Sequence, residues 1–445
     1  MHPSRVIRGA RSQRLAGRII LVGVSGSIAA VEVVKVIREL LRHGAEVRAV
    51  MSPEATRIIT PEALEFATGH PPILQLSGAV EHVSLLGPGE GRADLYLIAP
   101  ATANTLGKIA HGIDDTPVTT FASVALGGGV PVLVAPAMHA HMGRNPAVAE
   151  NLALLQKWGV GVIAPRSQEG EDKLASPEEI AAEVLRRLAD SPWAGRRVTV
   201  IGGGSRESID SVRSIANEST GETAVALAVQ AHLRGAQVDL WLGAHTALVP
   251  PFLSVTRWRS VRDLANLARG RAEALRASAL VIVPAALADY TTTPEPGKIS
   301  SRARPRLSLR LDPAPKLLPL LRTLAPPPTR LVGFKLLAET DPQRLRTAAE
   351  QLAREAGADA IVANGVESIG NGRVRALWVT PEKVEKIEGT KVELADRILD
   401  LAEPSAGLDP VQTHASGLPA GRAPRGPRRA RTGRGSAARS DPRRA

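Results

Sequence analysis

Residues 99–115 read APATANTLGKIAHGIDD and directly follow the apolar run Leu95–Ile98. An apolar run that gives way to proline and small polar residues is typical of a buried strand that ends in a loop. This loop consists mainly of Ala, Thr and Asn, and its first charged residue is Lys108. Small side chains let a large flat molecule come close, and an amide with two hydroxyls offers neutral hydrogen bonds. The stretch therefore predicts a site for an uncharged ring at the end of a strand.

Length and composition indicate a globular chain of more than one domain. Its 445 residues are enough for two or three domains, and 44% of them are hydrophobic. No apolar run reaches the roughly 18–20 residues that span a bilayer. The basic residues 1–17 lack the apolar centre of a secretory signal, so we expect a solvated N-terminal extension on a cytoplasmic protein. The sequence has no cysteine, which excludes disulfides, thiolate metal ligands and thiol nucleophiles.

Most of the net charge of +12 lies at the C-terminal end. Residues 411–445 contain nine Arg and one Asp, a net charge of +8. The rest of that segment is mostly Gly, Pro and Ala, so we expect residues 404–445 to form a disordered tail. Such a tail attracts polyanions without sequence preference, but a solubilising role is the simpler interpretation. We expect no membrane partner and no specific nucleic-acid partner.

Strand and helix patterns alternate along the chain, which predicts an α/β fold with parallel sheets. The expected strands are residues 18–24, 46–51, 94–99, 130–135, 198–201, 238–242, 280–283, 331–334 and 360–363. Pro192 and Gly195 predict a linker over residues 190–196. We therefore expect two doubly wound, Rossmann-like domains, at residues 18–189 and 197–403.

A glycine-rich turn, GVSGSIA at residues 23–29, joins the first expected strand to the first helix. Gly26 lets the backbone approach a ligand, Ser27 adds a hydroxyl, and a helix N-terminus attracts an anion, so the turn suits a phosphate. The carboxyl ends of parallel strands meet at one edge of a sheet. This edge would also carry Ser52, the APATANT loop and APAMHAHM at 135–142. A phosphate site beside a platform of small residues suits a mononucleotide such as FMN.

Together these motifs resemble the flavin-dependent cysteine decarboxylases, and within them the decarboxylase half of the bifunctional coenzyme A biosynthesis family CoaBC. The resemblance rests on GVSGSIAA, EHVSL (81–85), APATANTLGKIAHGIDD and PAM (136–138). It implies a flavodoxin-like domain that uses FMN to convert 4'-phosphopantothenoylcysteine to 4'-phosphopantetheine, with His82 as the base. It places seven residues at the cofactor: Gly26, Ser27, Ser52, Ala101, Thr102, Asn104 and Met138.

Two positions depart from that family. The usual Asn after PAM is His139 here, and histidine can still donate a hydrogen bond to a substrate carboxylate. The usual flap cysteine, which donates a proton, is missing, as in archaeal-like relatives with an EGxxKL segment. We expect Lys173 to donate that proton, with Glu171 or an ordered water as the alternatives.

The second half contains SRESIDSVRSIANESTG at residues 205–221. Its arginines, Arg206 and Arg213, suit phosphate or carboxylate recognition, and Asn217 can donate an amide proton to an acyl group. The preceding glycines lack the G-x-G-x-x-G spacing of a dinucleotide site, which disfavours an NAD(P) oxidoreductase. The second half resembles the ligase half of CoaBC through this segment, AALADY (285–290), GKI (297–299), GFK (333–335) and AN (363–364).

That second resemblance implies a phosphopantothenate–cysteine ligase, which uses CTP to form an acyl-cytidylate that cysteine then attacks. Lys298 would stabilise developing negative charge, Asn217 would orient the acyl-cytidylate, and Asp289 would hold Mg²⁺ or the nucleotide. CTP and ATP remain alternatives. The other residues implied at the substrates or nucleotide are Arg206, Ala314, Pro315, Lys316, Leu317, Phe334 and Asn364.

Two lysines that the ligase family carries before its last strand are Leu352 and Ala356 here. Arg344, Arg346 or Arg354 are the candidates to replace their charge. A catalytically impaired flavoprotein with a regulatory binding role, or a different flavin-dependent decarboxylase, remains an alternative to the complete bifunctional enzyme. The family forms homo-oligomers, so we expect a homo-oligomer.

Overall fold

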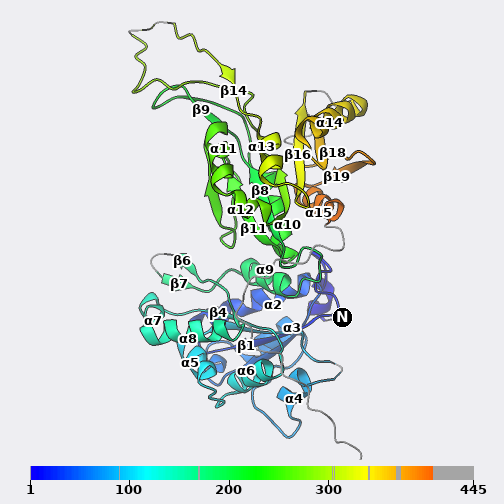
Figure 1. The fold of residues 1–445 in the computed structure, drawn as a ribbon. Helices are drawn as coiled ribbons and strands as arrows, with labels where there is room; N and C mark the ends of the chain where they lie inside the picture. Colours follow the sequence, from blue (N-terminus) through cyan, green and yellow to red (C-terminus); the bar gives the residue numbers. More distant parts are fainter. Residues whose placement is uncertain are drawn as a thin grey trace, which may run out of the picture. The chain divides into compact units, whose positions relative to one another are not determined.

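The computed structural model describes residues 2–89, 91–168, 171–302, 304, 306–338, 341–366 and 372–403, without the side chains of residues 167–168 and 171–172. The expected tail at residues 404–445 lies outside the described residues. Residues 2–189 form an N-terminal lobe and residues 193–403 a C-terminal lobe, each built around its own sheet (Figure 1). Both lobes are α/β, as the alternating pattern predicts.

The N-terminal lobe contains a five-stranded sheet in the order β2-β1-β3-β4-β5, with every pair parallel. The strands are β1 (Ile19–Val24), β2 (Glu46–Met51), β3 (Leu95–Ala101), β4 (Val132–Pro136) and β5 (Gly161–Val162). Four of these five were predicted. Because β1 lies between β2 and β3, the strand order reverses at β1, and ligands of such sheets bind at the carboxyl ends of the strands beside this reversal.

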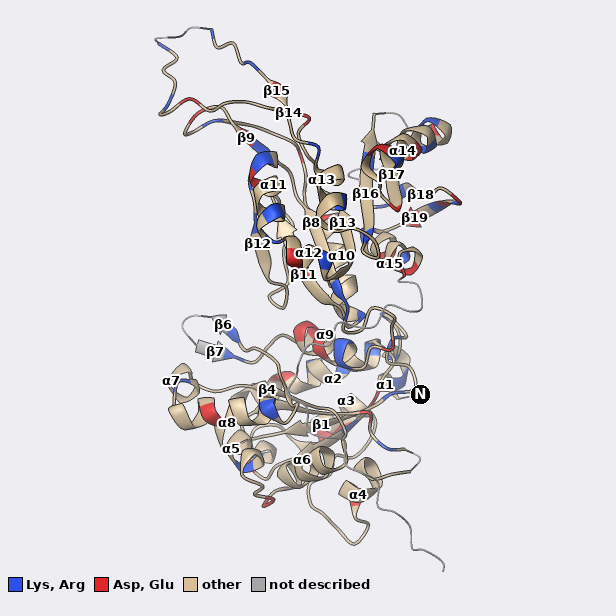
Figure 2. Cartoon of the chain, in the orientation of Figure 1, with Lys and Arg blue, Asp and Glu red and all other residues tan. Residues whose placement is uncertain are grey.

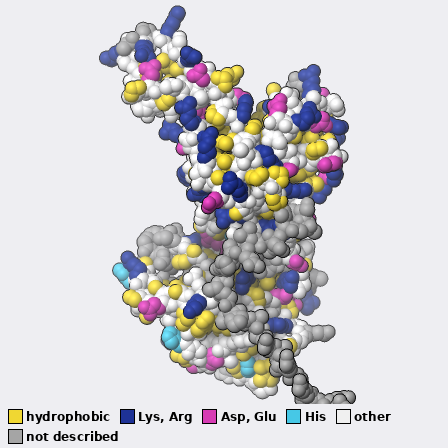
Figure 3. All heavy atoms as spheres, in the orientation of Figure 1, with side chains coloured by type: hydrophobic (Ala, Val, Ile, Leu, Met, Phe, Trp, Pro, Cys, Tyr) yellow, Lys and Arg dark blue, Asp and Glu magenta, His cyan; other side chains and the backbone are white. Residues whose placement is uncertain are grey.

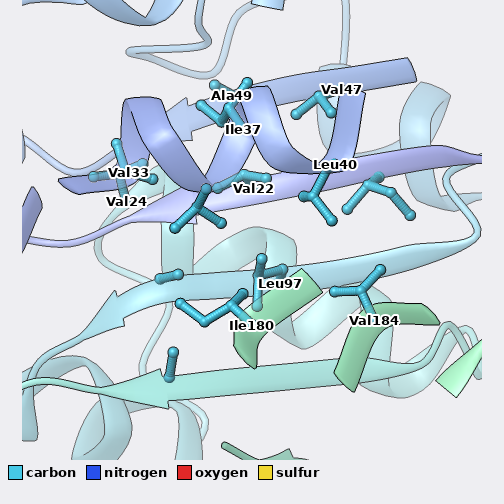
Figure 4. Close-up of a cluster of buried hydrophobic side chains, with 14 of the residues drawn as sticks. Val22, Val24, Val33, Ile37, Leu40, Val47, Ala49, Leu97, Ile180 and Val184 are labelled. Atoms are coloured by element: carbon cyan, nitrogen blue, oxygen red, sulfur yellow. The ribbon is translucent and has the colours of Figure 1, made fainter. Parts of the chain in front are cut away.

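Helices cover both faces of this sheet, which explains the continuous apolar strands. One face carries α2 (Val33–Arg42), α3 (Pro61–Thr68) and α9 (Pro177–Arg187), and the other carries α5 (Ala103–Ala110), α6 (Pro117–Gly127) and α8 (Pro146–Lys157). Figure 4 shows how Val22 of β1 and Leu97 of β3 lie among Ile37 and Leu40 of α2 and Ile180 of α9. All five side chains are fully buried.

Shorter elements complete the N-terminal lobe. They are α1 (Pro3–Ile7), η1 (Ile28–Glu32), η2 (Ala55–Arg57), α4 (Glu81–Leu86), α7 (Ala140–Gly143) and the hairpin of β6 (Arg166–Gln168) with β7 (Glu171–Lys173).

The expectation that residues 1–17 are a solvated extension is wrong for residues 2–17. Leu15 is 1% exposed and belongs to the same core cluster as α2. The backbone N–H of Gly9 donates to the carbonyl of Leu41 at 2.8 Å, and the guanidinium of Arg11 contacts the buried carboxylate of Glu39. Short apolar residues scattered among arginines give no periodic signal, so the sequence pattern did not show this packing.

The C-terminal lobe contains an eight-stranded sheet in the order β12-β11-β8-β13-β16-β17-β18-β19. The strands are β8 (Arg197–Gly202), β11 (Gln237–Leu242), β12 (Val255–Arg257), β13 (Ser278–Val283), β16 (Arg330–Leu337), β17 (Ala360–Gly365), β18 (Val374–Val379) and β19 (Val384–Gly389). Strands from β12 to β17 are parallel, while β17, β18 and β19 are antiparallel. The five predicted strands are all present, and the antiparallel end of the sheet was not predicted.

Two helical layers enclose this second sheet. Helices α10 (Glu222–Leu233) and α15 (Lys391–Leu401) pack on one face, and α11 (Val261–Gly270), α12 (Ala272–Arg276), α13 (Leu317–Leu324) and α14 (Pro342–Ala356) pack on the other. Trp193 is fully buried with the first group, and its indole N–H donates to the carbonyl of Leu399 at 3.1 Å. The predicted linker at 190–196 therefore contributes an anchor to the core of this lobe.

Two antiparallel ribbons extend from the C-terminal lobe, and we call residues 206–216 and 290–313 together the arm. The first ribbon pairs β9 (Arg206–Ser208) with β10 (Ser214–Ala216), and the second pairs β14 (Tyr290–Thr291) with β15 (Asp312–Pro313). Figure 1 shows both running away from the sheet, and Figure 2 shows that the arm carries basic and acidic residues together.

Charged side chains are dispersed over the described surface. In the view of Figure 3, Lys and Arg side chains of the C-terminal lobe alternate with hydrophobic and acidic ones. None of the described helices is both long and apolar enough to cross a membrane.

Candidate active sites

A single hydroxyl joins two of the predicted cofactor loops in the N-terminal lobe. The Oγ atom of Ser25, after β1, donates to the carbonyl of Pro100 at 2.7 Å and accepts from the backbone N–H of Thr102 at 3.0 Å. Ser25 is 1% exposed, so its hydroxyl is committed to these two bonds. The glycine-rich turn and the APATANT loop are thus held side by side at the carboxyl ends of β1 and β3.

The predicted hydroxyls also begin helices. The side chain of Ser27 caps η1 by accepting from the backbone N–H of Ala29, and that of Thr102 caps α5 by accepting from Thr105. The Oγ atom of Ser27 also donates to the carbonyl of Ala137 at 3.3 Å, which connects the end of β1 to the loop after β4. These bonds bring the segments that carry Ser27, Thr102 and Met138 together, as predicted.

Three further predicted cofactor residues differ in their surroundings. A Cβ atom at Gly26 would lie 2.4 Å from the Cβ of Glu54, so close packing on that neighbour already requires glycine. Ala101 is fully buried, whereas Asn104 is exposed. Ser52 is 4% exposed and its hydroxyl accepts from the backbone N–H of Ala55 at 3.3 Å.

A cavity of about 1040 Å³ lies beside these loops, between η1, α2, the loop after β4 and β7. Four predicted site residues line it, namely Ser27, Met138, His139 and Lys173. Gly26, Ser52, Ala101, Thr102 and Asn104 do not line it. The sequence analysis missed six charged lining residues, Glu32, Lys35, Glu39, Arg42, Arg166 and Glu178. Lys35 and Arg42 lie on the partly exposed side of the amphipathic helix α2, and the sequence pattern of such a side does not show whether it lines a cavity or faces bulk solvent. Glu39 is buried, and the pattern gave no sign of that either.

His82 is on α4 and does not line this cavity. Its ring meets that of Phe121 edge-on, with centroids 6.3 Å apart and an interplanar angle of 78°. Its Nδ1 atom is buried and has no hydrogen-bond partner within the described residues. An unpaired buried ring nitrogen costs about 1–3 kcal/mol, so it fits a site completed by a group from outside the described residues, such as a flavin or its substrate.

Backbone strain accompanies His82. Val80, immediately before α4, has φ 49° and ψ 49°, and it is the one non-glycine residue with positive φ in the described part of the chain. A β-branched residue in this conformation costs on the order of 1–3 kcal/mol, and such strain concentrates at functional sites.

The C-terminal lobe has a cavity of about 840 Å³ at the carboxyl ends of β8, β13, β16 and β17. Four predicted residues line it, namely Arg206, Asn217, Phe334 and Asn364. The amide of Asn217 donates to the carbonyl of Leu287 at 3.2 Å. A Cβ at Gly204 would lie 2.3 Å from the carbonyl oxygen of Asn217, so the glycine after β8 permits this close approach.

Phe334 contacts both the core and the cavity. The side chain packs against the core cluster that includes α10 and α15, and it also lines the cavity. The cavity wall further includes polar residues that the sequence analysis missed, among them Glu222, His245 and Lys391. Lys391 follows the capping residue Thr390 at the first position of α15, and its ammonium contacts the carboxylate of Glu222. This ion pair holds the pKa of Glu222 below its ordinary value.

The structure brings Asp289 together with residues 314–317, but outside the cavity. The Oδ1 atom of Asp289 lies 2.9 Å from Nζ of Lys316, and the backbone N–H of Ala314 donates to the carbonyl of Asp289 at 2.9 Å. Hydrogen bonding to Asp289 raises the pKa of Lys316. Pro315 is exposed, and Leu317 is buried at the start of α13.

A metal site at Asp289 would need ligands from a nucleotide. Within the described residues, no three His, Asp or Glu side chains form a group that could hold a metal ion. Mg²⁺ is commonly bound by one or two carboxylates together with substrate phosphates. Asp289 can contribute only one such ligand, and its carboxylate is shared with Lys316.

Lys298 is exposed on the arm and does not line the cavity. Nearby Arg213 is not available for a substrate phosphate in this structure, because its guanidinium is already hydrogen-bonded within the chain. Its Nε donates to the carboxylate of Asp210 at 2.9 Å, and its Nη2 donates to the backbone carbonyl of Ile299 at 2.8 Å. These bonds and three backbone donors hold the pKa of Asp210 well below its usual range. The arginine that sequence analysis associated with phosphate recognition is therefore part of an internal ion pair.

Helix α14 explains why the two family lysines are replaced. Leu352 packs against the core on its face of the sheet, and Ala356 is 2% exposed in the same cluster. Arg346 pairs with Glu350 at 2.7 Å along the helix, and Arg344 lines a separate cavity of about 490 Å³. The three arginines on this helix are absent from the lining of the 840 Å³ cavity, whose described cationic side chains are Arg206 and Lys391.

Comparison with known proteins agrees with this division into two lobes. The Flavoprotein family matches residues 8–189, and the DNA/pantothenate metabolism flavoprotein C-terminal domain matches residues 193–404. A coenzyme A biosynthesis bifunctional protein CoaBC from Thermococcus kodakarensis is 40% identical over 405 residues, covering 91% of this chain and 99% of that protein.

Another CoaBC protein, from Methanocaldococcus jannaschii, is 33% identical over 90% of this chain and 97% of its own length. Among solved structures, the DNA/pantothenate metabolism flavoprotein from Streptococcus pneumoniae is 28% identical, with a TM-score of 0.42, and covers 46% of this chain and 97% of its own.

Restoring a family lysine at position 356 should destabilise the C-terminal lobe. Ala356→Lys forces an ammonium against a packed apolar cluster, which we expect to cost about 2 kcal/mol or more. Gln351→Lys, an exposed position on the same helix, is the matched control and should stay within about 0.5 kcal/mol. Urea unfolding followed by circular dichroism measures both. Equal stability of the two variants would show that position 356 faces solvent.

Proposed function

This chain belongs to the CoaBC family of bifunctional coenzyme A biosynthesis proteins, and we propose how its two lobes divide the reaction. It is an enzyme that carries both the decarboxylase and the ligase domain of that family. We propose that the C-terminal lobe joins cysteine to 4'-phosphopantothenate with CTP, and that the N-terminal lobe then decarboxylates 4'-phosphopantothenoylcysteine with FMN.

One observation carries this proposal above all. Each lobe has a cavity at the carboxyl ends of its parallel strands, and motif residues of the matching family line it. Ser27 and Met138 line the first, and Arg206 and Asn217 line the second. An NAD(P) site would be expected at the same edge, but the broken glycine spacing after β8 argues against it.

In the proposed decarboxylase, bound FMN supplies the two-electron chemistry and the protein supplies orientation and proton transfer. The turn at Gly26 and Ser27 would hold the phosphate, while Ser52, Ala101–Asn104 and Met138 would contact the rest of the cofactor. His82 would take the thiol proton through its ring, whose Nδ1 has no hydrogen-bond partner within the described residues. His139 would donate to the substrate carboxylate.

The reaction also needs a proton donor for the product. Cysteine is absent from the sequence, and Lys173 lines the cavity with Ser27 and His139. We assign the donor role to the ammonium of Lys173, which would protonate the ene-thiol carbon after CO₂ has left.

In the proposed ligase, a carboxylate oxygen of 4'-phosphopantothenate attacks the α-phosphorus of CTP, and pyrophosphate leaves. The amine of cysteine then attacks the acyl carbon, a proton leaves the amine, and CMP departs. Asn217 would orient the acyl-cytidylate, and Lys298 would offset charge that develops during both steps. Phe334, Asn364, Lys316 and its neighbours at 314–317 would contact the nucleotide, and Mg²⁺ would join Asp289 to its phosphates.

We also propose that the enzyme is a homo-oligomer. Val80 and Val83, on either side of His82 in the chain, are 48% and 49% exposed. Exposed apolar groups beside a buried unpaired polar atom suit a surface that another copy covers. We predict an oligomer in solution at micromolar concentration, measured by light scattering. A monomer that nevertheless turns over substrate would contradict this part of the proposal.

The experiment that tests the function supplies 4'-phosphopantothenate, cysteine and CTP to the purified chain and follows pyrophosphate and CO₂ separately. Both products are expected, and pyrophosphate should form faster with CTP than with ATP. Pyrophosphate without CO₂ would show that the cysteine-free flap disables decarboxylation, and neither product would contradict the proposed function.

His82→Gln should remove decarboxylation and leave ligation intact. Loss of a general base lowers rates about 10²–10⁴-fold, so CO₂ release from supplied 4'-phosphopantothenoylcysteine should fall by that factor while pyrophosphate release is unchanged. His111→Gln, an exposed histidine of the same lobe, is the control. Normal CO₂ release by His82→Gln would remove His82 from the mechanism.

Lys298→Gln should have the opposite effect. Removal of one charge-stabilising group costs about 10²–10³-fold, so pyrophosphate release should drop while supplied 4'-phosphopantothenoylcysteine is still decarboxylated at the normal rate. Lys386→Gln, at an exposed position on β19, is the matched control. Full ligation by Lys298→Gln would mean that Lys298 is an ordinary surface lysine.

A further inference from the structure

The backbone of Lys298 is fixed on both sides although its side chain is exposed. On one side, the carbonyl of Gly297 accepts from the backbone N–H of Ser211 at 3.1 Å. On the other, the N–H of Ile299 donates to Oδ2 of Asp210 at 3.1 Å, and the carbonyl of Ile299 accepts from Arg213 at 2.8 Å. Both peptide groups next to Lys298 are therefore tied to one short loop, residues 209–213.

Asp210 is the centre of this loop. It is 2% exposed, and its Oδ1 atom accepts from the backbone N–H groups of Val212 at 2.8 Å and Arg213 at 2.7 Å. Its Oδ2 atom accepts from Nε of Arg213 at 2.9 Å and from Ile299. One buried carboxylate thus satisfies donors from two segments that are about ninety residues apart in the chain.

Two more observations show that the turn itself is held in a defined conformation. Gly297 has φ +75°, a conformation that side chains rarely adopt. The backbone N–H of Glu295 donates to the carbonyl of Ile209 at 2.9 Å, which extends the contact between the two segments. The pairing of Arg213 with Asp210 also holds the pKa of that carboxyl well below its usual range, so the pair is charged at neutral pH.

A lysine with no function beyond solubility needs no such support. A buried ion pair is weak evidence for stability, because desolvation offsets much of its attraction. The ion pair of Arg213 with Asp210 instead fixes geometry, because the guanidinium donates hydrogen bonds to the carboxylate of Asp210 and to the backbone carbonyl of Ile299 at the same time. The lysine side chain is long and flexible, so a fixed backbone restricts where its ammonium can reach.

We propose that Asp210, through Arg213, is a positioning residue that holds the Gly297–Ile299 turn so that Lys298 reaches the ligase reaction centre. This inference rests on the proposed role of Lys298. Asp210 does not touch substrate, and its contribution passes through the turn that carries Lys298.

The test is a double-mutant cycle on the full chain, with pyrophosphate release as the readout. Asp210→Asn keeps the size of the side chain but weakens its bonds to Arg213 and Ile299. We expect kcat for ligation to fall at least tenfold with KM for CTP changed less than threefold. In Lys298→Gln, adding Asp210→Asn should cause no further loss, because the residue acts through the missing ammonium.

Controls separate positioning from folding. Decarboxylation of supplied 4'-phosphopantothenoylcysteine by the same samples should stay at the wild-type rate. Asp312→Asn, an exposed aspartate on the arm that contacts Arg310, should ligate normally. If Asp210→Asn fails to fold, Arg213→Lys takes its place, because lysine keeps the positive charge but cannot make the two-pronged hydrogen bonds of a guanidinium. We expect a smaller loss in kcat for ligation. Adding Arg213→Lys to Lys298→Gln should cause no further loss.

Three results distinguish the possibilities. Losses that multiply in the double variant would overturn the proposal, because Asp210 would then act independently of Lys298. Wild-type ligation by Asp210→Asn would overturn it as well. If Lys298→Gln alone ligates at the normal rate, the failure lies in the proposed role of Lys298, and the positioning role fails with it.

Discussion

A parallel strand that is covered on both faces leaves room for polar side chains mainly at its two ends, and ligands bind at the carboxyl ends. The central strands β1, β3 and β4 of the N-terminal sheet are apolar and buried along nearly their whole length, because helices pack on both faces. Polar residues consequently collect where β1, β3 and β4 end, and the Ser25 hydroxyl fixes the distance between two of those ends. The same constraint acts in the C-terminal lobe, where Arg206 comes shortly after β8 and Asn364 lies near the end of β17, while Asn217 follows β10 of the antiparallel ribbon.

This constraint also explains which features the sequence could predict. Continuous apolar runs identified nine of the parallel strands between β1 and β17, because burial on both faces leaves a strong local signal, whereas the short parallel edge strands β5 and β12 were missed. The pair β18 and β19 was missed. Residues of β19 alternate between exposed and buried, and charged residues such as Glu385 and Lys386 hide the apolar ones. Residues 2–17 were misjudged because their packing depends on a few long-range contacts, such as that of Leu15 with the core, rather than on a periodic face.

The predicted site residues also fall into two groups, those whose position follows from a strand end and those whose position depends on a charged partner. Motif residues beside strand ends, such as Ser27 and Asn217, line cavities, since chain position fixes where a strand ends. Charged residues were less predictable, because a sequence does not say which partner a charge finds. Arg213 is bound to Asp210, whereas Lys391, at the start of the last helix, lies on the cavity wall. Only the folded chain distinguishes an arginine that binds its own carboxylate from one that faces a ligand.

The distribution of charge on the C-terminal lobe constrains how a triphosphate could be neutralised. Ala356 is buried and Leu352 is partly buried against the core, so a lysine at position 356 of this chain would bury its ammonium. Within the described cavity wall, cations come instead from Arg206 and Lys391, and the latter is balanced by Glu222. The remaining cation assigned to the reaction, Lys298, is outside the wall and is held by a turn on the arm. A ligand that needs charge from all three must therefore draw on groups whose positions are set by separate parts of the fold.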